Sequence, residues 1–419
     1  MKLAVIGAGI IGITTAYELA ADGHEVTVLE RRGAAAEETS FANAGVVAPG
    51  YVTPWAAPGM PGKVLSHLFS KHAPVKLGLP LSGGDIAWML KWLRACKLET
   101  YLANRARLQR LAFYSRERLH HLTAELQLEY DRSPGYMVLL RSEKDSRLVQ
   151  PGLQVLRDAG VAFREIVAAE VRTIEPAINP DTKFLGGIHL PDDEVANCRQ
   201  FALLLKAEAQ KIGVSFEFNT TVAHIDKNQP ASLQIAGEDR PRRYDRLVLC
   251  AGLASAQLLK PLGLKIPMAA VYGYSISAPI REPLNAPRSS LMDERYKVAI
   301  SRLGNRVRVA GSAEIGGTLQ NKRAGSIQTL YKVLHDWFPG AAQHSNTGAS
   351  VQEWKGARPM LPDGPPIIGE SGIPGLLLNL GHGSSGWALS CGSARAVADM
   401  MAGKKADIDM EGLDISRLA

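Results

Sequence analysis

The first thirty residues, MKLAVIGAGIIGITTAYELAADGHEVTVLE (1–30), decide the fold of this chain. An apolar run at residues 2–6 predicts a strand, and a glycine-rich turn follows it. Residues 13–22 then predict a helix and residues 25–30 a second strand. The stretch therefore predicts a strand–turn–helix–strand unit at the start of the chain.

The glycine turn has the spacing that suits a bound dinucleotide. Gly7 permits the tight turn, Gly9 lets the backbone approach a pyrophosphate, and Gly12 allows close packing of helix on strand. The helix N-terminus offers free amides and a partial positive charge to the phosphates. Glu30 ends the second strand, where a carboxylate accepts hydrogen bonds from ribose hydroxyls and disfavours a 2′-phosphate. Dinucleotide binding is favoured over a purely structural glycine turn.

Composition limits the class of protein. The chain has 419 residues, 46% hydrophobic and 21% charged, enough for about two or three domain-sized cores. Its four cysteines are far apart and form no CxxC pair, so neither a disulfide framework nor a metal site is predicted. The net charge of +7 comes from scattered Lys and Arg, which favours a solvated basic surface over a nucleic-acid partner.

Location is predicted from what the sequence does not contain. Its start has no secretory signal pattern, and no stretch offers roughly 18 uninterrupted apolar residues. We expect a cytoplasmic protein. Peripheral contact with the cytoplasmic face of the inner membrane and the oligomeric state stay open.

The remaining chain contains segments with helical patterns and segments with strand patterns. Residues 85–128 predict two amphipathic helices, and residues 48–84, rich in Pro and Gly, predict a long irregular excursion with short helices. After Tyr136, short alternating segments predict strands of a mostly antiparallel sheet. Residues 198–218 and 246–250 instead resemble helix and strand of a buried parallel sheet.

The predicted fold class is mixed α/β (α+β), with a Rossmann-like cofactor domain of discontinuous segments and an inserted, mostly antiparallel substrate domain. The cofactor domain is predicted from residues 1–84, 191–263 and 346–419, and the substrate domain from residues 85–190 and 264–345.

The C-terminal part distinguishes between possible dinucleotides. Residues 375–379 predict a buried strand, 380–386 a glycine-rich turn and 387–401 a helix. A helix N-terminus there can face the pyrimidine edge of a flavin and stabilise its reduced anion, which favours FAD over NAD. An ordinary strand-to-helix turn is the alternative, and His382 is favoured as a turn residue over a catalytic base.

Two further segments suit close approach of backbone to a cofactor. Residues 40–46 are a run of small side chains, with a loop or helix cap led by Ser40 as the alternative. Ala251 and Gly252 follow an apolar strand, and their small side chains also predict a close approach of the backbone to the nucleotide.

Arg358 is the candidate substrate-binding residue. It lies in a Gly- and Pro-rich stretch, residues 354–364, that predicts neither helix nor regular strand. A guanidinium can hold a carboxylate through two parallel hydrogen bonds. The alternative is a structural ion pair with Asp363.

Together these motifs resemble the bacterial D-amino acid dehydrogenase small subunit, within the D-amino acid oxidase and glycine oxidase group, over residues 2–403. The motifs are residues 7–12 with Glu30, 39–45, 51–59, 273–275, 356–364 and 381–387. The resemblance implies noncovalent FAD and oxidative deamination of a small D-amino acid to the 2-oxo acid and ammonia. It further implies hydride transfer from Cα–H to flavin N5, with electrons passed to a quinone or other carrier. A D-hydroxyproline, glycine or secondary-amine dehydrogenase or oxidase of the same group is the alternative.

The resemblance also assigns roles. Arg358 matches the Arg of a Gly-x-Arg-Pro motif that holds the substrate carboxylate, and Val222 matches a backbone position near the adenine. Tyr274 and Tyr296 are candidates for phenol contacts to substrate. The chain departs from the pattern at Tyr272, where Lys is expected, and at Ser384 and Ser385, where Thr-Leu is expected.

The predicted catalytic residues are Arg358, Tyr274 and Tyr296. The predicted cofactor-binding residues are Gly7, Gly9, Ile10, Ile11, Gly12, Glu30, Arg31, Ser40, Asn43, Ala44, Gly45, Val46, Val222, Ala251, Gly252, Gly381, His382, Gly383, Ser384, Ser385 and Gly386.

Overall fold

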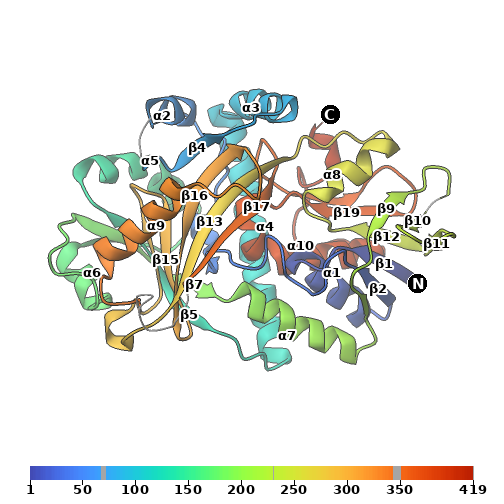
Figure 1. Cartoon of the computed structure of the whole chain (residues 1–419), viewed down its shortest axis with the longest axis horizontal. Helices are drawn as coiled ribbons and strands as arrows, with labels where there is room; N and C mark the ends of the chain where they lie inside the picture. The colour runs from blue at the N-terminus through green and yellow to red at the C-terminus, as the bar shows by residue number, and fades with distance from the viewer. Residues whose placement is uncertain (68–71, 230, 343–350, 419) are drawn as a thin grey trace.

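The computed structural model describes residues 1–67, 72–229, 231–342 and 351–418, and two β-sheets organise them (Figure 1). A six-stranded sheet near the N-terminus has the order β18-β19-β12-β1-β2-β8. A larger, ten-stranded sheet lies beside it (Figure 1). This arrangement confirms the predicted mixed α/β class.

The smaller sheet is parallel except at one edge. Its parallel strands are β1 (Lys2–Ile6), β2 (Glu25–Leu29), β8 (Ser215–Glu217), β12 (Arg246–Leu249) and β19 (Leu376–Leu380), and β18 (Ile367–Glu370) is antiparallel. One face packs against α1 (Ile10–Ala21), α7 (Cys198–Lys211) and α10 (Gly386–Met401). The other face packs against α8 (Ala254–Leu259) and the small sheet of β9 (Val222–Ile225), β10 (Ser232–Ile235) and β11 (Arg242–Arg243). The central strands β1, β12 and β19 are buried on both faces, and their sequences are almost continuously apolar.

The larger sheet is mostly antiparallel, as predicted. Its main path is β17 (Gln352–Met360), β13 (Ala269–Pro279), β16 (Arg306–Gly316), β15 (Val298–Leu303), β14 (Ser290–Asp293), β5 (Arg132–Leu140), β7 (Gly186–Ala196) and β3 (Val46–Val47). The side strands are β4 (Val75–Gly78), on β16, and β6 (Arg164–Val167), on β7. Within this larger sheet, only the pairs β14–β5 and β16–β4 are parallel among the described strands.

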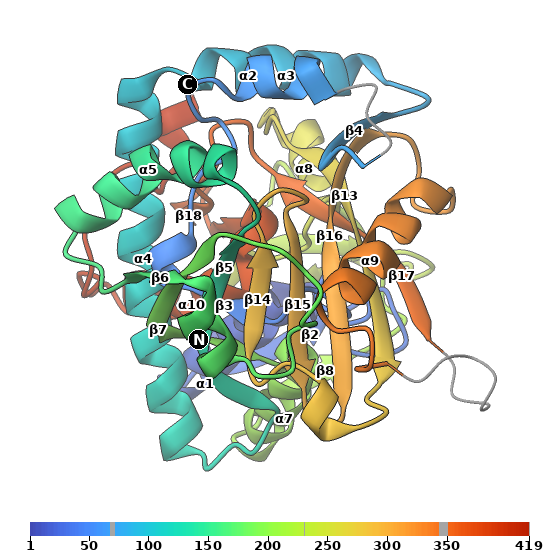
Figure 2. The same ribbon diagram turned by 90° about the vertical axis from the view of Figure 1, so that its left-hand side faces the viewer.

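The two faces of this sheet differ in chemistry. Its outer face is apolar and packs against α9 (Ala324–Trp337), as Figure 2 shows. On the inner face, buried Ser275, Ser277 and Ser301 surround Arg308, and all four side chains make polar contacts there. A polar inner face between two domains is unusual for a core and indicates a functional role.

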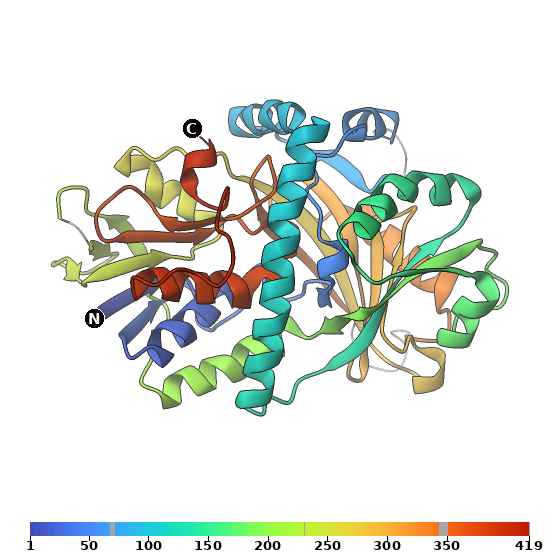
Figure 3. The same ribbon diagram turned by 180° about the vertical axis from the view of Figure 1, so that it is seen from behind.

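The predicted helices in residues 85–128 are α3 (Gly83–Ala95) and α4 (Leu98–Glu125). A capping box of Ser82 and Asp85 begins α3. The 28-residue α4 runs along the junction of the two sheets (Figure 3). The excursion before them contains η1 (Pro49–Tyr51), α2 (Met60–His67) and β4, and its residues 68–71 lie outside the described part. The remaining helices described are α5 (Glu143–Asp158) and α6 (Ala168–Ile174).

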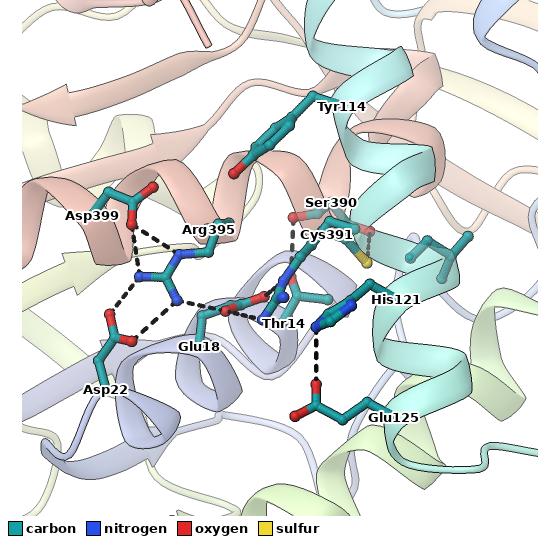
Figure 4. A network of polar contacts seen from close by, with 12 residues as sticks. Thr14, Glu18, Asp22, Tyr114, His121, Glu125, Ser390, Cys391, Arg395 and Asp399 are labelled. Atoms are coloured by element: carbon teal, nitrogen blue, oxygen red, sulfur yellow. Dashed lines mark hydrogen bonds and ion pairs between the residues drawn. The ribbon is translucent and has the colours of Figure 1, made fainter. Parts of the chain in front are cut away.

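A buried charge network joins α1, α4 and α10. Arg118 Nε and Arg395 Nη1 donate to the two oxygens of Glu18 at 2.6 and 2.9 Å, and the Glu18 side chain is fully buried. Figure 4 shows Arg395 also reaching Asp22 and Asp399. The network fixes the helices that lie behind the glycine turn.

The strands of the smaller sheet all fall within residues assigned to the cofactor domain, whereas β3, β4 and β17 of the same assigned segments pair in the larger sheet. The boundary at 345/346 lies outside the described residues, and the domain limits stay a prediction. None of the described helices combines the length and apolar character needed to cross a bilayer.

Candidate active site

A cavity of about 1160 Å³ lies between the two sheets. The turns after β1, β2, β12 and β19 border it, together with residues 39–46 and the inner face of the larger sheet. Ligands of open α/β sheets bind at the carboxyl ends of the strands, and four such ends meet here. The cavity therefore unites the predicted cofactor segments with the predicted substrate sheet.

The glycine turn has the close contacts that its sequence predicted. Gly7 has φ +108°, and a Cβ there would lie 2.7 Å from Cys250 O. A Cβ on Gly12 would lie 1.8 Å from Gly7 O, so only glycine lets α1 pack this closely. The N-terminus of α1 consequently borders the cavity at Gly9, Ile10 and Ile11. The backbone forms a cradle that a pyrophosphate fits.

Glu30 is held at the rim of this cradle. Its Oε2 accepts the Ala8 amide at 2.7 Å and its Oε1 accepts the Arg32 amide at 2.8 Å. Each carboxylate oxygen has a second lone pair, so the group can still accept from ribose hydroxyls. Arg31 also borders the cavity, where its guanidinium pairs with Glu38 at 2.6 Å.

The C-terminal turn brings a second helix N-terminus to the cavity. A short 3-10 turn, η5 (Gly383–Ser385), leads into α10, whose first turn contains no acidic residue. The positive end of this 16-residue helix is therefore not neutralised by its own side chains. The η5 turn and the N-terminus of α10 suit the electron-accepting ring of a flavin, because reduction places negative charge on that ring.

His382 is not placed for base catalysis. Burial lowers its pKa to about 3, and its Nε2 lies 3.1 Å from Ser393 Oγ. A neutral imidazole with so low a pKa is a weak proton acceptor at neutral pH. The preference for a turn residue over a catalytic base stays a prediction.

Arg358 lies in a regular strand, which corrects the prediction of an irregular segment. It is in β17 and is paired with Val271 of β13. The glycines and prolines around it suggested a loop, but β17 pairs along β13 over nine residues and tertiary pairing overrides local propensity. Gly356 is needed there because a Cβ would overlap the ring of Trp354.

The Arg358 guanidinium lies half-buried at the cavity with an incomplete set of partners. Its Nη1 donates to Ser312 O at 3.1 Å, and within the described residues it has no carboxylate partner. Asp363, the alternative partner, instead pairs with Arg417 at 2.9 Å. Burial lowers the Arg358 pKa to about 10, so the group stays charged at neutral pH. A half-buried cation beside a cavity, with no carboxylate partner in the described part of the chain, is suited to an anionic ligand.

Gly273 makes room for this guanidinium. A Cβ at Gly273 would lie 2.2 Å from Arg358 Nη2. Beside it, the pairing of β13 with β16 shifts register, and Ser312 takes a positive φ of 58°. The bulge directs the Ser312 carbonyl at Arg358. Sequence reasoning noticed the motif at Gly273 but not its steric role.

The two predicted tyrosines do not bring their hydroxyls to Arg358. Tyr274 borders the cavity, but strand alternation turns its ring to the opposite, α9 side, where its hydroxyl donates to Glu314. Tyr296 precedes β15 and does not border the cavity; its ring lies against Arg141, with a guanidinium–centroid distance of 5.2 Å. Both predicted substrate contacts are therefore corrected.

All predicted cofactor-binding residues except Gly12 border the cavity, and Gly12 packs behind it. Their individual roles stay predictions. Aromatic residues without a predicted role also border it, namely Tyr51, Trp55, Tyr101, Tyr136, Trp354 and Trp387. Tyr51, Trp55, Trp354 and Trp387 lie in segments that the sequence distinguishes, whereas Tyr101 and Tyr136 have no distinguishing local pattern.

Comparison with known proteins identifies the class that this fold and cavity define. Residues 2–400 match the family model described as FAD dependent oxidoreductase (DAO), and the chain belongs to this family. The D-amino acid dehydrogenase of Bradyrhizobium diazoefficiens is 41% identical over 421 aligned positions, covering 100% of this chain and 99% of that protein.

Solved structures share the fold. Glycine oxidase from Geobacillus kaustophilus superposes with a TM-score of 0.77 at 20% identity, over 99% of this chain and 98% of that one. Iminodiacetate oxidase from Chelativorans sp. BNC1 gives 0.72 at 21% identity, over 99% and 98%. L-proline dehydrogenase from P. horikoshii gives 0.72 at 17% identity, over 100% and 97%.

Proposed function

We propose that this chain is an FAD-dependent dehydrogenase that oxidises a small D-amino acid to the 2-oxo acid and ammonia. The observation that carries the proposal is the half-buried guanidinium of Arg358 beside the cofactor cavity, which has no carboxylate partner among the described residues. It supplies a fixed positive charge for a carboxylate, and the 41% identity to a D-amino acid dehydrogenase supports the choice of enantiomer. Glycine, D-hydroxyproline or secondary-amine oxidation is the alternative within the same group.

The chain's contribution to this reaction is positioning. FAD, when bound, supplies the hydride acceptor at its N5 atom. Arg358 binds the substrate carboxylate, with its guanidinium kept in place by the Ser312 carbonyl. Trp354 and Gly356 share its face of β17 and border the cavity beside it. A carboxylate fixed in this way limits the directions in which the substrate Cα–H bond can point.

Anaerobic flavin bleaching tests the proposed substrate. Both enantiomers of the common amino acids are mixed with oxygen-free enzyme, together with glycine, D-hydroxyproline and N-methylglycine. We expect D-alanine and similarly small D-amino acids to bleach the visible flavin band, and L-enantiomers to leave it unchanged. Bleaching by L-amino acids alone would contradict the proposal, and bleaching by glycine or N-methylglycine alone would select the alternative.

We further propose that a quinone or another carrier, and not oxygen, reoxidises the flavin. This proposal rests on the resemblance to the dehydrogenase branch. Reduced enzyme should be reoxidised much faster by a quinone analogue than by air. Hydrogen peroxide formation that matches substrate consumption, at a rate equal to that with the quinone, would place the chain with the oxidases.

Peripheral membrane contact is the third part of the proposal, and α3 is its candidate surface. Ile86, Leu90 and Leu93 form one exposed stripe of α3, with 50%, 54% and 45% of each residue accessible. The exposed cations Lys91 and Arg94 lie beside them. Apolar side chains flanked by cations suit the surface of an anionic bilayer. The opposite face of α3 packs on Met360, which follows Arg358 by two residues in β17.

Vesicle co-sedimentation tests this surface. Wild type should sediment with vesicles containing phosphatidylglycerol but not with phosphatidylcholine alone, and salt should weaken the binding. A triple variant Ile86→Ser, Leu90→Ser, Leu93→Ser should stay in the supernatant, whereas Leu203→Ser, 40% exposed on α7, should behave as wild type. Equal sedimentation of the triple variant and wild type would refute the assignment.

A further inference from the structure

The loop at residues 42–45 is held from behind by the polar inner face of the larger sheet. Three consecutive carbonyl oxygens of this loop each accept a hydrogen bond from a side chain of a different strand. The pairs are Ser275 Oγ with Ala42 O at 2.8 Å, Arg308 Nη1 with Asn43 O at 3.2 Å, and Ser301 Oγ with Ala44 O at 2.8 Å. Side chains of β13, β16 and β15 therefore clamp one face of the loop.

Strand register makes this clamp rigid. Ser277 of β13, Arg308 of β16 and Ser301 of β15 are direct neighbours in one row across the sheet. Arg308 Nε donates to Ser277 Oγ at 2.8 Å, and Ser301 Oγ lies 2.8 Å from Ser290 Oγ. The clamp is thus anchored on regular strands, which hold a group more accurately than a loop does.

The direction of the carbonyls fixes the direction of the amides. In a planar trans peptide the C=O of one residue and the N–H of the next point in opposite directions. The amides of Asn43, Ala44 and Gly45 therefore point away from the sheet. Asn43 Oδ1 accepts the Gly45 amide at 3.0 Å. The other two amides have no hydrogen-bond partner among the described residues, and Asn43 and Ala44 both border the cavity.

Arg308 adds a full charge behind these amides. No carboxylate lies within ion-pair distance of it in the described part of the chain. Burial lowers its pKa to about 10, which leaves it protonated at neutral pH. A cation in a buried site interacts with a nearby charge more strongly than it would in water. Its side chain touches the loop that borders the cavity, so its field acts on whatever the loop contacts.

We propose that Ser275, Ser301 and Arg308 are positioning residues that present the Asn43 and Ala44 amides to the flavin, and that the Arg308 charge favours the reduced flavin. Both effects stabilise negative charge on the ring. The proposal rests on FAD binding in this cavity and is independent of which amino acid is oxidised.

The flavin reduction potential tests the proposal without any amino acid. Purified holoenzymes are titrated with dithionite against a reference dye. Arg308→Met should shift the two-electron equilibrium about tenfold toward oxidised flavin, a potential about 30 mV lower. Arg308→Lys keeps the charge and should stay within about twofold of wild type. Ser301→Ala should shift the equilibrium about threefold. Arg302→Met, on the neighbouring strand and without contact to the loop, is the control.

The variants separate positioning from simple structural support. If Arg308→Met retains FAD and the wild-type potential, the proposal is wrong. If Arg308→Met does not retain FAD, the potentials of Ser301→Ala and Arg308→Lys test the proposal instead. A Ser301→Ala potential below that of Arg308→Lys supports the proposal, and equal potentials for Ser301→Ala, Arg308→Lys and wild type overturn it.

Discussion

Arg358 shows how much one side chain depends on the backbone around it. Its guanidinium needs the missing Cβ of Gly273 and the carbonyl of the bulged Ser312. A role for Arg358 in substrate binding could be predicted from sequence, because a charged residue in a glycine-rich, partly apolar segment is conspicuous. The steric role of Gly273 could not, because it depends on which residues of β13 and β17 face each other.

Substitution of Arg358 should separate substrate binding from cofactor binding. Arg358→Ala removes a charge-assisted pair and should cost about 3 to 5 kcal/mol of transition-state stabilisation. This loss corresponds to a kcat/KM roughly a hundredfold to several thousandfold lower. Arg358→Lys keeps the charge but loses the planar fork and should recover only part of the activity. Steady-state kinetics with the best amino acid and a dye acceptor measure both. Near-normal kcat/KM in a flavin-loaded Arg358→Ala enzyme would show that the carboxylate binds elsewhere.

Asp193 of β7 should make stability depend on pH. Its side chain is buried, its Oδ2 has no hydrogen-bond partner among the described residues, and burial raises its pKa from 3.8 to about 7. Between these values the unfolded chain ionises while the folded protein keeps the proton, so stability falls as pH rises and the loss is complete above about pH 7. Asp193→Asn should therefore gain stability relative to wild type between pH 4 and pH 8, by up to about 4 kcal/mol, offset by loss of the Asp193–Arg116 ion pair at 3.6 Å. Urea unfolding at both pH values measures this, and a difference independent of pH would contradict it.

At the scale of elements, local pattern predicted the strands and helices better than it predicted their faces. The helices α3, α4, α7 and α10 follow from apolar periodicity, and β1 and β2 from apolar runs around a glycine turn. Tyr274 was misassigned because the alternation of side chains along a strand shows only that Gly273 and Tyr274 lie on opposite faces of the sheet. Which face of the sheet borders the cavity depends on where α9 packs, and α9 lies about fifty residues later in the chain. The strand β17 was missed because its one glycine, Gly356, serves packing and not a turn.

The Glu18 network is the expected weak point of helix packing. Glu18→Gln leaves Arg118 and Arg395 without their shared carboxylate in a buried site, and breaking a buried pair on one side costs about 3 to 5 kcal/mol. Urea denaturation should show this loss in the free energy of unfolding. Glu125→Gln is the matched control because its pair with His121 is exposed and should contribute less than about 1 kcal/mol. Equal effects of the two substitutions would show that the network in Figure 4 does not hold the helices together.

At the scale of the whole molecule, the cavity joins two sheets that each have a separate core. The sequence allowed both sheets to be predicted, because each follows from local periodicity, and it allowed the cofactor segments to be grouped by their motifs. It did not predict the polar inner face, since Ser275, Ser301 and Arg308 come from three strands and acquire a common partner only when the sheet closes over residues 42–45.

FAD should stabilise the whole molecule because its proposed contacts come from both halves. A ligand at 100 times its Kd adds about 2.7 kcal/mol to the folded state. For 419 residues the entropy of unfolding is about 0.9 kcal/mol/K, so Tm should rise by about 3 °C. Apoprotein melted with increasing FAD measures the shift. Glu30→Gln removes one ribose acceptor and should need more FAD for the same rise, whereas Glu25→Gln, exposed at the start of β2, should match wild type. A Tm of the apoprotein that does not respond to FAD would mean that the cofactor is not bound between the two sheets.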